Sequence, residues 1–225
     1  MPDSLAHKFR GILREGWVAQ VDDYALDCHW AAGGEVLIVG DASGTISGFD
    51  GKSGRSLWRQ DNTHDGGLLA FAVHPDGKIF SSAGQDGQVI FWETESGAQL
   101  GVIGIASSWV EHLAWSPDGS CLSVACSRLA VVLNSEGKER WRSEEHPSTV
   151  SAIAWSGERE LATACYGCVT FYDIKERKII QSLEWKGSLV SMILSPDGEI
   201  VACGSQDNSV HFWRRSTSED AMMSG

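Results

Sequence analysis

The feature that most constrains the fold of this chain is an internal repeat. The stretch GQDGQVIFWE, residues 84–93, returns as SQDNSVHFWR, residues 205–214, so that Gln85 and Gln206 are 121 residues apart. A turn sequence, Pro-Asp-Gly, repeats as well, at Pro75, Pro117 and Pro196. Proline followed by Asp-Gly presets the backbone angles of a β-turn. Repeats spaced by multiples of about forty residues predict an array of similar units.

Alignment of the chain on itself at this period gives five units. Each unit has a strand-ending pair, an aromatic or apolar residue followed by a polar one: Phe49-Asp50, Trp92-Glu93, Leu133-Asn134, Tyr172-Asp173 and Trp213-Arg214. The second unit has four short apolar runs separated by turn residues, at 68–73, 78–84, 88–92 and 98–104. Runs this short, rich in β-branched and aromatic residues, predict β-strands. Four short antiparallel strands in about forty residues are typical of a β-propeller blade.

These units resemble the WD-repeat propeller family over roughly residues 17–214, although none of the five pairs reads Trp-Asp. The resemblance implies an all-β propeller with five four-stranded blades, which is either a ring of five or part of a longer, seven-bladed propeller. We expect units at about residues 22–59, 60–101, 102–142, 143–184 and 185–214. An N-terminal tail, 1–16, and a polar C-terminal end, 215–225, flank them. The stretch GWVAQV, residues 16–21, resembles the strand that closes such rings.

The resemblance also implies a buried hydrogen-bond network of structural side chains in each blade. The second unit has the complete set, His64, Ser82, Asp86 and Trp92. The fifth unit keeps Asp207 and Trp213, with Trp185 and Cys203 in the other two places. A buried carboxylate costs several kcal/mol unless hydrogen-bond donors surround it. We therefore expect the second blade to be the most rigid.

The fourth unit keeps another part of this set, His146 and Thr163. Tyr166 replaces its aspartate and Tyr172 its tryptophan. We expect blades with incomplete sets to depend on packing.

The charge and hydropathy of the sequence argue against two classes of partner, nucleic acids and membranes. Thirty acidic residues outnumber 18 Lys and Arg, giving a formal charge of −12, and no Lys or Arg cluster is present that could replace phosphate counterions. No apolar block has the length of a signal peptide, and none approaches the roughly twenty residues of a membrane span. The sequence predicts a cytoplasmic protein with neither nucleic-acid nor membrane partners.

No arrangement of residues predicts a catalytic, cofactor-binding or metal site. Cys165 and Cys168 form a Cys-x-x-Cys pair, but zinc requires further ligands and the redox version of this motif begins a helix. We interpret both as small buried hydrophobic residues. The seven histidines show no metal-ligand spacing. A Ser-His-Asp set drawn from the second unit is better explained by its structural network.

The predicted function is that of a non-enzymatic scaffold that binds a protein or peptide partner, as in the WD-repeat family. In that family the face where each first strand begins often meets partners. The candidate contact residues here are Tyr24, Gly67, Trp109, Thr149 and Ser188, with Gln85 and Gln206 before the turn aspartates. Aromatic residues on such a rim are able to anchor an interface.

Two alternatives remain open. The stretch FDGKSGRSLW, residues 49–58, resembles the blade motif of quinone-cofactor propellers, which would suggest a propeller oxidoreductase or cofactor binder, or an outer-membrane assembly scaffold. A structural subunit that completes a multi-chain propeller is the second alternative.

Overall fold

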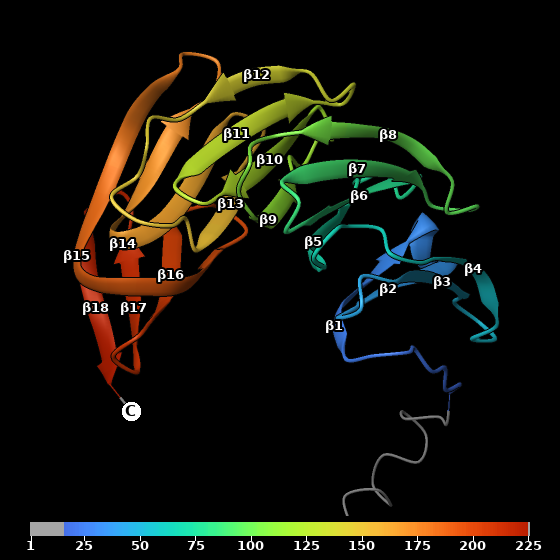
Figure 1. Ribbon diagram of the computed structural model, residues 1–225. Helices are drawn as coiled ribbons and strands as arrows, with labels where there is room; N and C mark the ends of the chain where they lie inside the picture. The colour runs from blue at the N-terminus through green and yellow to red at the C-terminus, as the bar shows by residue number, and fades with distance from the viewer. Residues whose placement is uncertain (1–15, 225) are drawn as a thin grey trace, which may run out of the picture.

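The computed structural model describes residues 16–224, which form antiparallel β-sheets arranged as successive blades (Figure 1). The first blade contains β1 (Ala25–Ala31), β2 (Val36–Asp41), β3 (Ile46–Asp50) and β4 (Ser56–Gln60). A single 3₁₀ turn, η1 (Ala32–Gly34), connects β1 to β2. The second blade contains β5 (Leu68–Val73), β6 (Ile79–Gly84), β7 (Gln88–Glu93) and β8 (Gln99–Gly104). The third contains β9 (Val110–Trp115), β10 (Cys121–Cys126), β11 (Leu129–Asn134) and β12 (Glu139–Arg142).

The fourth and fifth blades share one six-stranded sheet. Its strands are β13 (Ala152–Ser156), β14 (Glu160–Asp173), β15 (Lys178–Leu194), β16 (Ile200–Ser205), β17 (Ser209–Arg214) and β18 (Glu219–Ser224). The first part of β14 pairs with β13 and its second part with β15, while β15 pairs first with β14 and then with β16. Each of these two long strands therefore occupies two positions, and the predicted propeller of five four-stranded blades is confirmed.

The blades pack face to face because their middle strands are apolar on both sides. All six residues of β10 are buried, whereas every residue of the outermost strand β8 is exposed or half-buried. Apolar clusters fill the spaces between successive blades. One of them joins Ile38 and Trp58 of the first blade to Phe71 and Trp92 of the second.

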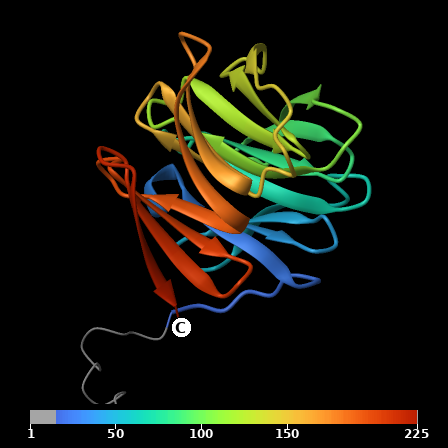
Figure 2. The same ribbon diagram turned by 90° about the vertical axis from the view of Figure 1, so that its left-hand side faces the viewer.

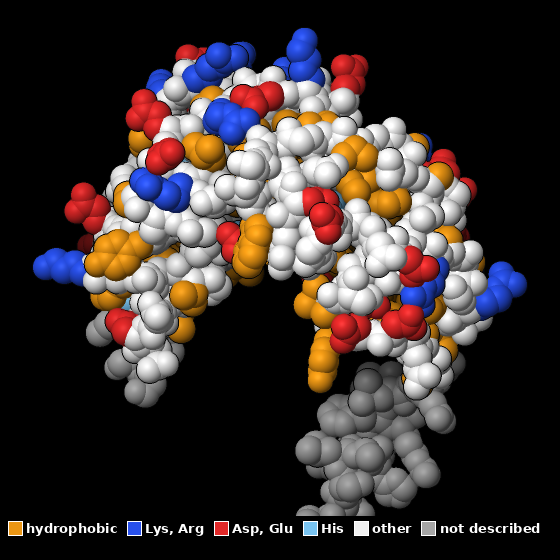
Figure 3. All heavy atoms as spheres, in the orientation of Figure 1, with side chains coloured by type: hydrophobic (Ala, Val, Ile, Leu, Met, Phe, Trp, Pro, Cys, Tyr) orange, Lys and Arg blue, Asp and Glu red, His pale blue; other side chains and the backbone are white. Residues whose placement is uncertain are grey.

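The five blades form an open arch (Figure 1), and the space-filling view shows a wide opening between its two ends (Figure 3). Figure 2, with the fourth and fifth blades toward the viewer, shows the same succession of sheets. The end blades expose large apolar side chains, Trp30 on the first and Ile193 on the fifth.

A tryptophan contact fixes the second blade against the first. Trp58, from β4, is buried against the turn that connects β7 to β8. Its Nε1 donates a hydrogen bond to the carbonyl oxygen of Thr94 at 2.8 Å. The ring lies against Gly97, which has a φ of +65° and whose Cβ, if present, would be 2.5 Å from Trp58. This close approach requires glycine.

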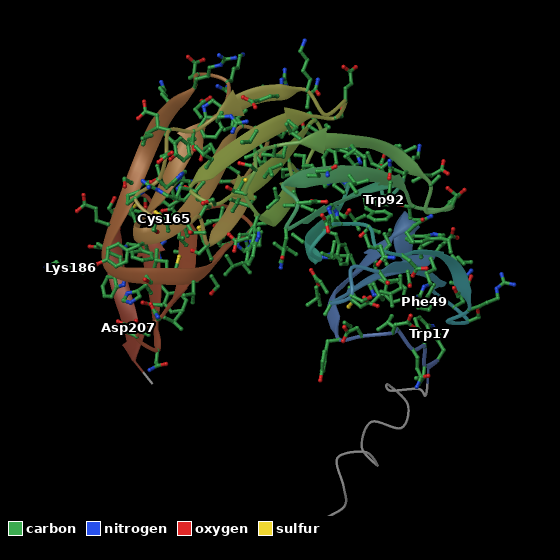
Figure 4. All side chains as sticks on the ribbon, in the orientation of Figure 1. Trp17, Phe49, Trp92, Cys165, Lys186 and Asp207 are labelled. Carbon is green, nitrogen blue, oxygen red and sulfur yellow. The ribbon has the colours of Figure 1, made fainter. Side chains whose placement is uncertain are left out.

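The predicted closing strand is not formed: residues 16–21 have no strand pairing. Trp17 nevertheless makes the same kind of contact with the first blade that Trp58 makes with the second. Its Nε1 donates to the carbonyl of Gly51 at 3.0 Å, and its ring lies 6.3 Å from that of Phe49 (Figure 4). The segment therefore lies where the outer strand of a neighbouring blade would lie, without strand partners of its own.

The polar C-terminal end contains a strand that its composition does not predict. β18 pairs with β17 from Arg214↔Glu219 to Ser209↔Ser224 and supplies the outer strand of the fifth blade. The backbone groups of β17 require a partner whatever the side chains of that partner are. The N-terminal tail lies almost entirely outside the described residues, which begin at Gly16.

Replacement of Gly97 by alanine tests the packing between the first two blades. Gly97→Ala should lower the free energy of unfolding by about 2–3 kcal/mol, because the methyl group meets the Trp58 ring and the backbone angle disfavours a side chain. The control is Gly101→Ala in β8, where an added Cβ meets nothing within 4 Å. Urea unfolding measures both variants, and equal effects would contradict this contact.

Candidate interaction surface

A chain of hydrogen bonds connects the loop before β5 to the turn between β6 and β7. His64 Nδ1 lies 3.0 Å from a carboxylate oxygen of Asp86, and His64 Nε2 lies 2.8 Å from the hydroxyl of Ser82. Trp92 Nε1 donates to the same hydroxyl at 2.8 Å. The structure thus brings together the four side chains that the sequence places in the second blade. They hold two loops at one end of the blade in a fixed arrangement.

The chemistry of the partners fixes the protons in this network. A carboxylate only accepts hydrogen bonds, so Nδ1 of His64 donates to Asp86. In the neutral imidazole with its proton on Nδ1, Nε2 accepts a hydrogen bond from the Ser82 hydroxyl, which itself accepts one from Trp92. Burial lowers the pKa of His64, against the opposing effect of Asp86. Asp86 also accepts from the backbone amides of Asp65 and Gln88.

The fourth blade has a hydrogen-bond network that the sequence does not predict in full. Its histidine, His146, donates from Nδ1 to the carbonyl of Arg128 at 2.9 Å, in the turn of the third blade. The Nε2 atom lies 2.9 Å from the Thr163 hydroxyl and 3.1 Å from that of Tyr172. A backbone carbonyl replaces the missing aspartate and a phenol replaces the indole. This blade therefore has a hydrogen-bond network in addition to the packing that the sequence predicts.

The fifth blade uses a different histidine. Asp207 is exposed and accepts hydrogen bonds from the amide and hydroxyl of Ser209, which lower its pKa. The Ser209 hydroxyl lies 2.7 Å from Nε2 of His211. His211 is fully buried between the rings of Trp185 and Trp213. The alternation of side chains along β17 could have indicated it, since His211 shares a face with Trp213.

The candidate contact residues lie at equivalent positions of successive blades. In three blades, a residue just before the first strand accepts a hydrogen bond at its backbone carbonyl. The donor is the backbone amide of the residue 18 positions later. The donor and acceptor pairs are Ala42 to Tyr24 at 2.9 Å, Gln85 to Gly67 at 3.1 Å and Gln206 to Ser188 at 3.0 Å. These shared contacts align the loops on one face of the arch.

Two aromatic side chains on this face are open to solvent. Tyr24 is 84% exposed and Trp109 is 53% exposed. Beside Trp109 lies a shallow hollow of about 410 Å³, which Thr149, Glu111 and Ser127 also line. An exposed ring next to a hollow of this size provides apolar area for a partner side chain.

Gln85 and Gln206 stand at equivalent positions of the repeat but differ in the exposure of their side chains. Gln85 is half-buried, and its side chain packs close to Gly66, where an added Cβ would lie 3.0 Å from Oε1. Gln206 is exposed and so is Thr149, whereas Ser188 is half-buried. Gln206 and Thr149 are therefore the more accessible polar members of the set.

Over residues 16–224, no group of three or more His, Cys, Asp or Glu side chains is arranged to hold a metal ion. The same part of the chain has no helix with the length and hydrophobicity that a membrane span requires.

Two family models match parts of the chain. The model described as "WD domain, G-beta repeat" matches residues 177–214, from the outer strand of the fourth blade to β17. The model described as "Outer membrane protein assembly factor BamB" matches residues 42–100, which include the Trp58 contact and most of the second blade.

Comparisons with known proteins over most of the chain also point to a WD-repeat propeller. The chain is 25% identical over 200 residues to Actin-interacting protein 1 of Drosophila melanogaster, covering 84% of this chain and 32% of the relative. It is 27% identical over 167 residues to WD repeat-containing protein VIP3 of Arabidopsis thaliana, covering 62% and 52%. The chain thus spans about a third to a half of these relatives. A chain in a crystal structure of the mitotic checkpoint complex superposes with a TM-score of 0.80 at 20% identity, covering 91% of this chain and 65% of that one.

Substitution of two equivalent aspartates tests the network of the second blade. Asp86→Ala should lower the free energy of unfolding by about 2–4 kcal/mol, because the buried Nδ1–H of His64 and two amides lose their acceptor. Asp207→Ala, at the matching turn, should have a clearly smaller effect because that carboxylate is exposed. Thermal unfolding measures both, and equal shifts would contradict the assignment.

Two buried histidines, His64 and His146, and the half-buried His112 predict an acid-sensitive fold. Burial lowers the pKa of His64, His112 and His146 below the ordinary value near 6.5. The unfolded chain then binds more protons, so the stability from these groups is complete above about pH 6.5 and is lost as the pH falls below it. The melting temperature should fall as the pH is lowered from 7.5 to 5.5, and the fall should be smaller in His146→Gln. An unchanged or rising melting temperature on acidification would overturn this prediction.

Proposed function

For this chain, a WD-repeat β-propeller protein by sequence and fold, we propose a non-enzymatic role as a scaffold that binds a protein or peptide partner. The partner contacts the face that carries Tyr24, Trp109 and Gln206. Protein partners are the class expected from WD-repeat relatives, and the whole relatives are longer than this chain.

The observation that carries the proposal is the exposed Trp109 ring on a face with fixed loops. Exposing a large aromatic side chain to water is unfavourable unless a partner covers it, and tryptophan is among the residues that most often dominate binding energy. The carbonyl contacts at Tyr24, Gly67 and Ser188 hold loops of the first, second and fifth blades in place on the same face. A partner therefore meets a preorganised surface and loses little free energy to ordering it.

Support for a non-enzymatic role comes from the burial of the side chains that could resemble a catalytic set. Ser82 is fully buried, and its hydroxyl is bonded to both His64 and Trp92. A nucleophile has to reach the substrate, which this hydroxyl could do only after the network opens. The three side chains are explained by their structural role, and we propose no catalytic, cofactor or metal site.

A cytoplasmic location, without nucleic-acid or membrane partners, remains a prediction. It rests on the formal charge of −12 and on six cysteines that are all free thiols in the structure.

Trp109→Ala tests the contact face. The substitution should weaken binding of captured partners at least about tenfold, because the aromatic anchor is removed, and should leave the melting temperature nearly unchanged. The experiment compares affinity capture by wild-type and variant protein, with quantitative mass spectrometry of the bound fraction.

The matched control is Trp30→Ala, which removes a tryptophan of nearly equal exposure, 55%, at the opposite end of β1 from Tyr24. Partners lost with Trp109→Ala and retained with Trp30→Ala support the proposed face. Partners retained by a folded Trp109→Ala variant would exclude it.

A further inference from the structure

Two cysteines face each other in the fourth blade. The Sγ atoms of Cys165 and Cys168 are 3.7 Å apart, on either side of the bend at Tyr166 and Gly167 in β14 (Figure 4 labels Cys165). We propose that this pair is a modification site, which a hydroperoxide oxidises reversibly to an intramolecular disulfide.

The repeat explains why the backbone permits this bond. The third and fourth blades are offset by 39 residues, the distance from Leu133 to Tyr172, so Cys165 and Cys168 correspond to Cys126 and Leu129. In the third blade, Cys126 and Leu129 are directly opposed partners of β10 and β11. Opposed residues of antiparallel strands have Cα atoms about 4.5–5.5 Å apart, within the range of about 4.4–6.8 Å that disulfides span. At the same separation in the fourth blade, rotation of the two side chains would join the sulfur atoms.

The two thiols differ in access to solvent. Cys165 is fully buried. Cys168 is half-buried and lines a surface hollow of about 670 Å³ together with Tyr166, Glu184 and Lys186. A small solute in this hollow therefore meets Cys168 first, and Cys165 lies behind it within reach.

The hydrogen bonds favour ionisation of the accessible sulfur. The contact with Cys165, reinforced by the hydroxyl of Thr170 at 3.6 Å, lowers the pKa of Cys168. Burial and the nearby carboxylate of Glu184 oppose this shift. The same contact, together with burial, raises the pKa of Cys165. The thiolate, which is the reactive form, is thus located on the sulfur that a solute reaches.

The reaction has two balanced steps. The Cys168 thiolate attacks one peroxide oxygen, the O–O bond breaks, and the leaving hydroxide or alkoxide takes a proton, which leaves a sulfenic acid on Cys168. The sulfur of Cys165 then attacks Cys168, the S–O bond breaks, and water leaves with the thiol proton. The peroxide is reduced by two electrons and the two thiols are oxidised by two. An added dithiol reverses the change.

The other cysteines provide internal comparisons. Cys121, Cys126 and Cys203 are buried, and burial raises the pKa of Cys203 to about 12. Cys28 is exposed. Oxidation governed by exposure alone would therefore occur first at Cys28, whereas the proposed mechanism directs it to the pair.

The experiment treats the whole folded protein with a small excess of hydrogen peroxide, blocks the remaining thiols, and digests the chain with trypsin. Both cysteines fall in the single peptide 160–175, between Arg159 and Lys175. We expect this peptide to lose the mass of two hydrogen atoms, at least about ten times faster than Cys28 is oxidised. Dithiothreitol should restore the lost mass. A peptide that keeps both thiols while Cys28 is oxidised would overturn the proposal.

Two variants separate the roles of the sulfur atoms. In Cys165→Ser, the sulfenic acid on Cys168 should persist and be captured by dimedone. In Cys168→Ser, Cys165 should remain a thiol at the same peroxide dose. Equal reaction of the two variants would contradict the assigned order. The wild-type peptide measurement is decisive by itself if either variant fails to fold.

Discussion

The structure depends on the burial of the blade faces that lie against a neighbouring blade. A blade saturates its own backbone hydrogen bonds, but the favourable free energy comes from apolar side chains pressed between neighbouring sheets. Residues of β10 are buried on both sides for this reason, and Trp58 reaches from one blade onto the turn of the next. The loops at the contact face follow from this packing. They are the ends of sheets whose mutual positions are already fixed.

Much of the fold could be predicted because its signals are local. Turn residues and short apolar runs place the strands of the second blade within one residue of their observed bounds, as in β5 and β6. The two segments whose strand pairing could not be predicted have a common physical origin. β18 is an outer strand paired through its backbone, which a polar segment can do, and residues 16–21 have the sequence of a strand but no neighbour that pairs with them. Strand pairing is a property of two segments, and one segment does not reveal it.

In the candidate site, too, features set by the local sequence could be predicted, and contacts from other blades could not. The side chains of the second blade could be named because each stands at a fixed place in the repeat. The acceptor for His146 could not, because it is the carbonyl of Arg128 from another blade, and every residue has a carbonyl. The equivalence of Gln85 and Gln206 could be predicted, but their different exposure could not, because neighbouring loops such as that at Gly66 determine it.

The continuity of β15 has a consequence for how the molecule comes apart. Loops separate the first three blades, but one uninterrupted strand belongs to both the fourth and the fifth. Unfolding of either blade would remove the partner strand from one half of β15 and disturb the other half, which belongs to the other blade, so the two should open together as a single foldon. Native-state hydrogen exchange would then divide the arch into unequal cooperative units, with the largest of them at the C-terminal end.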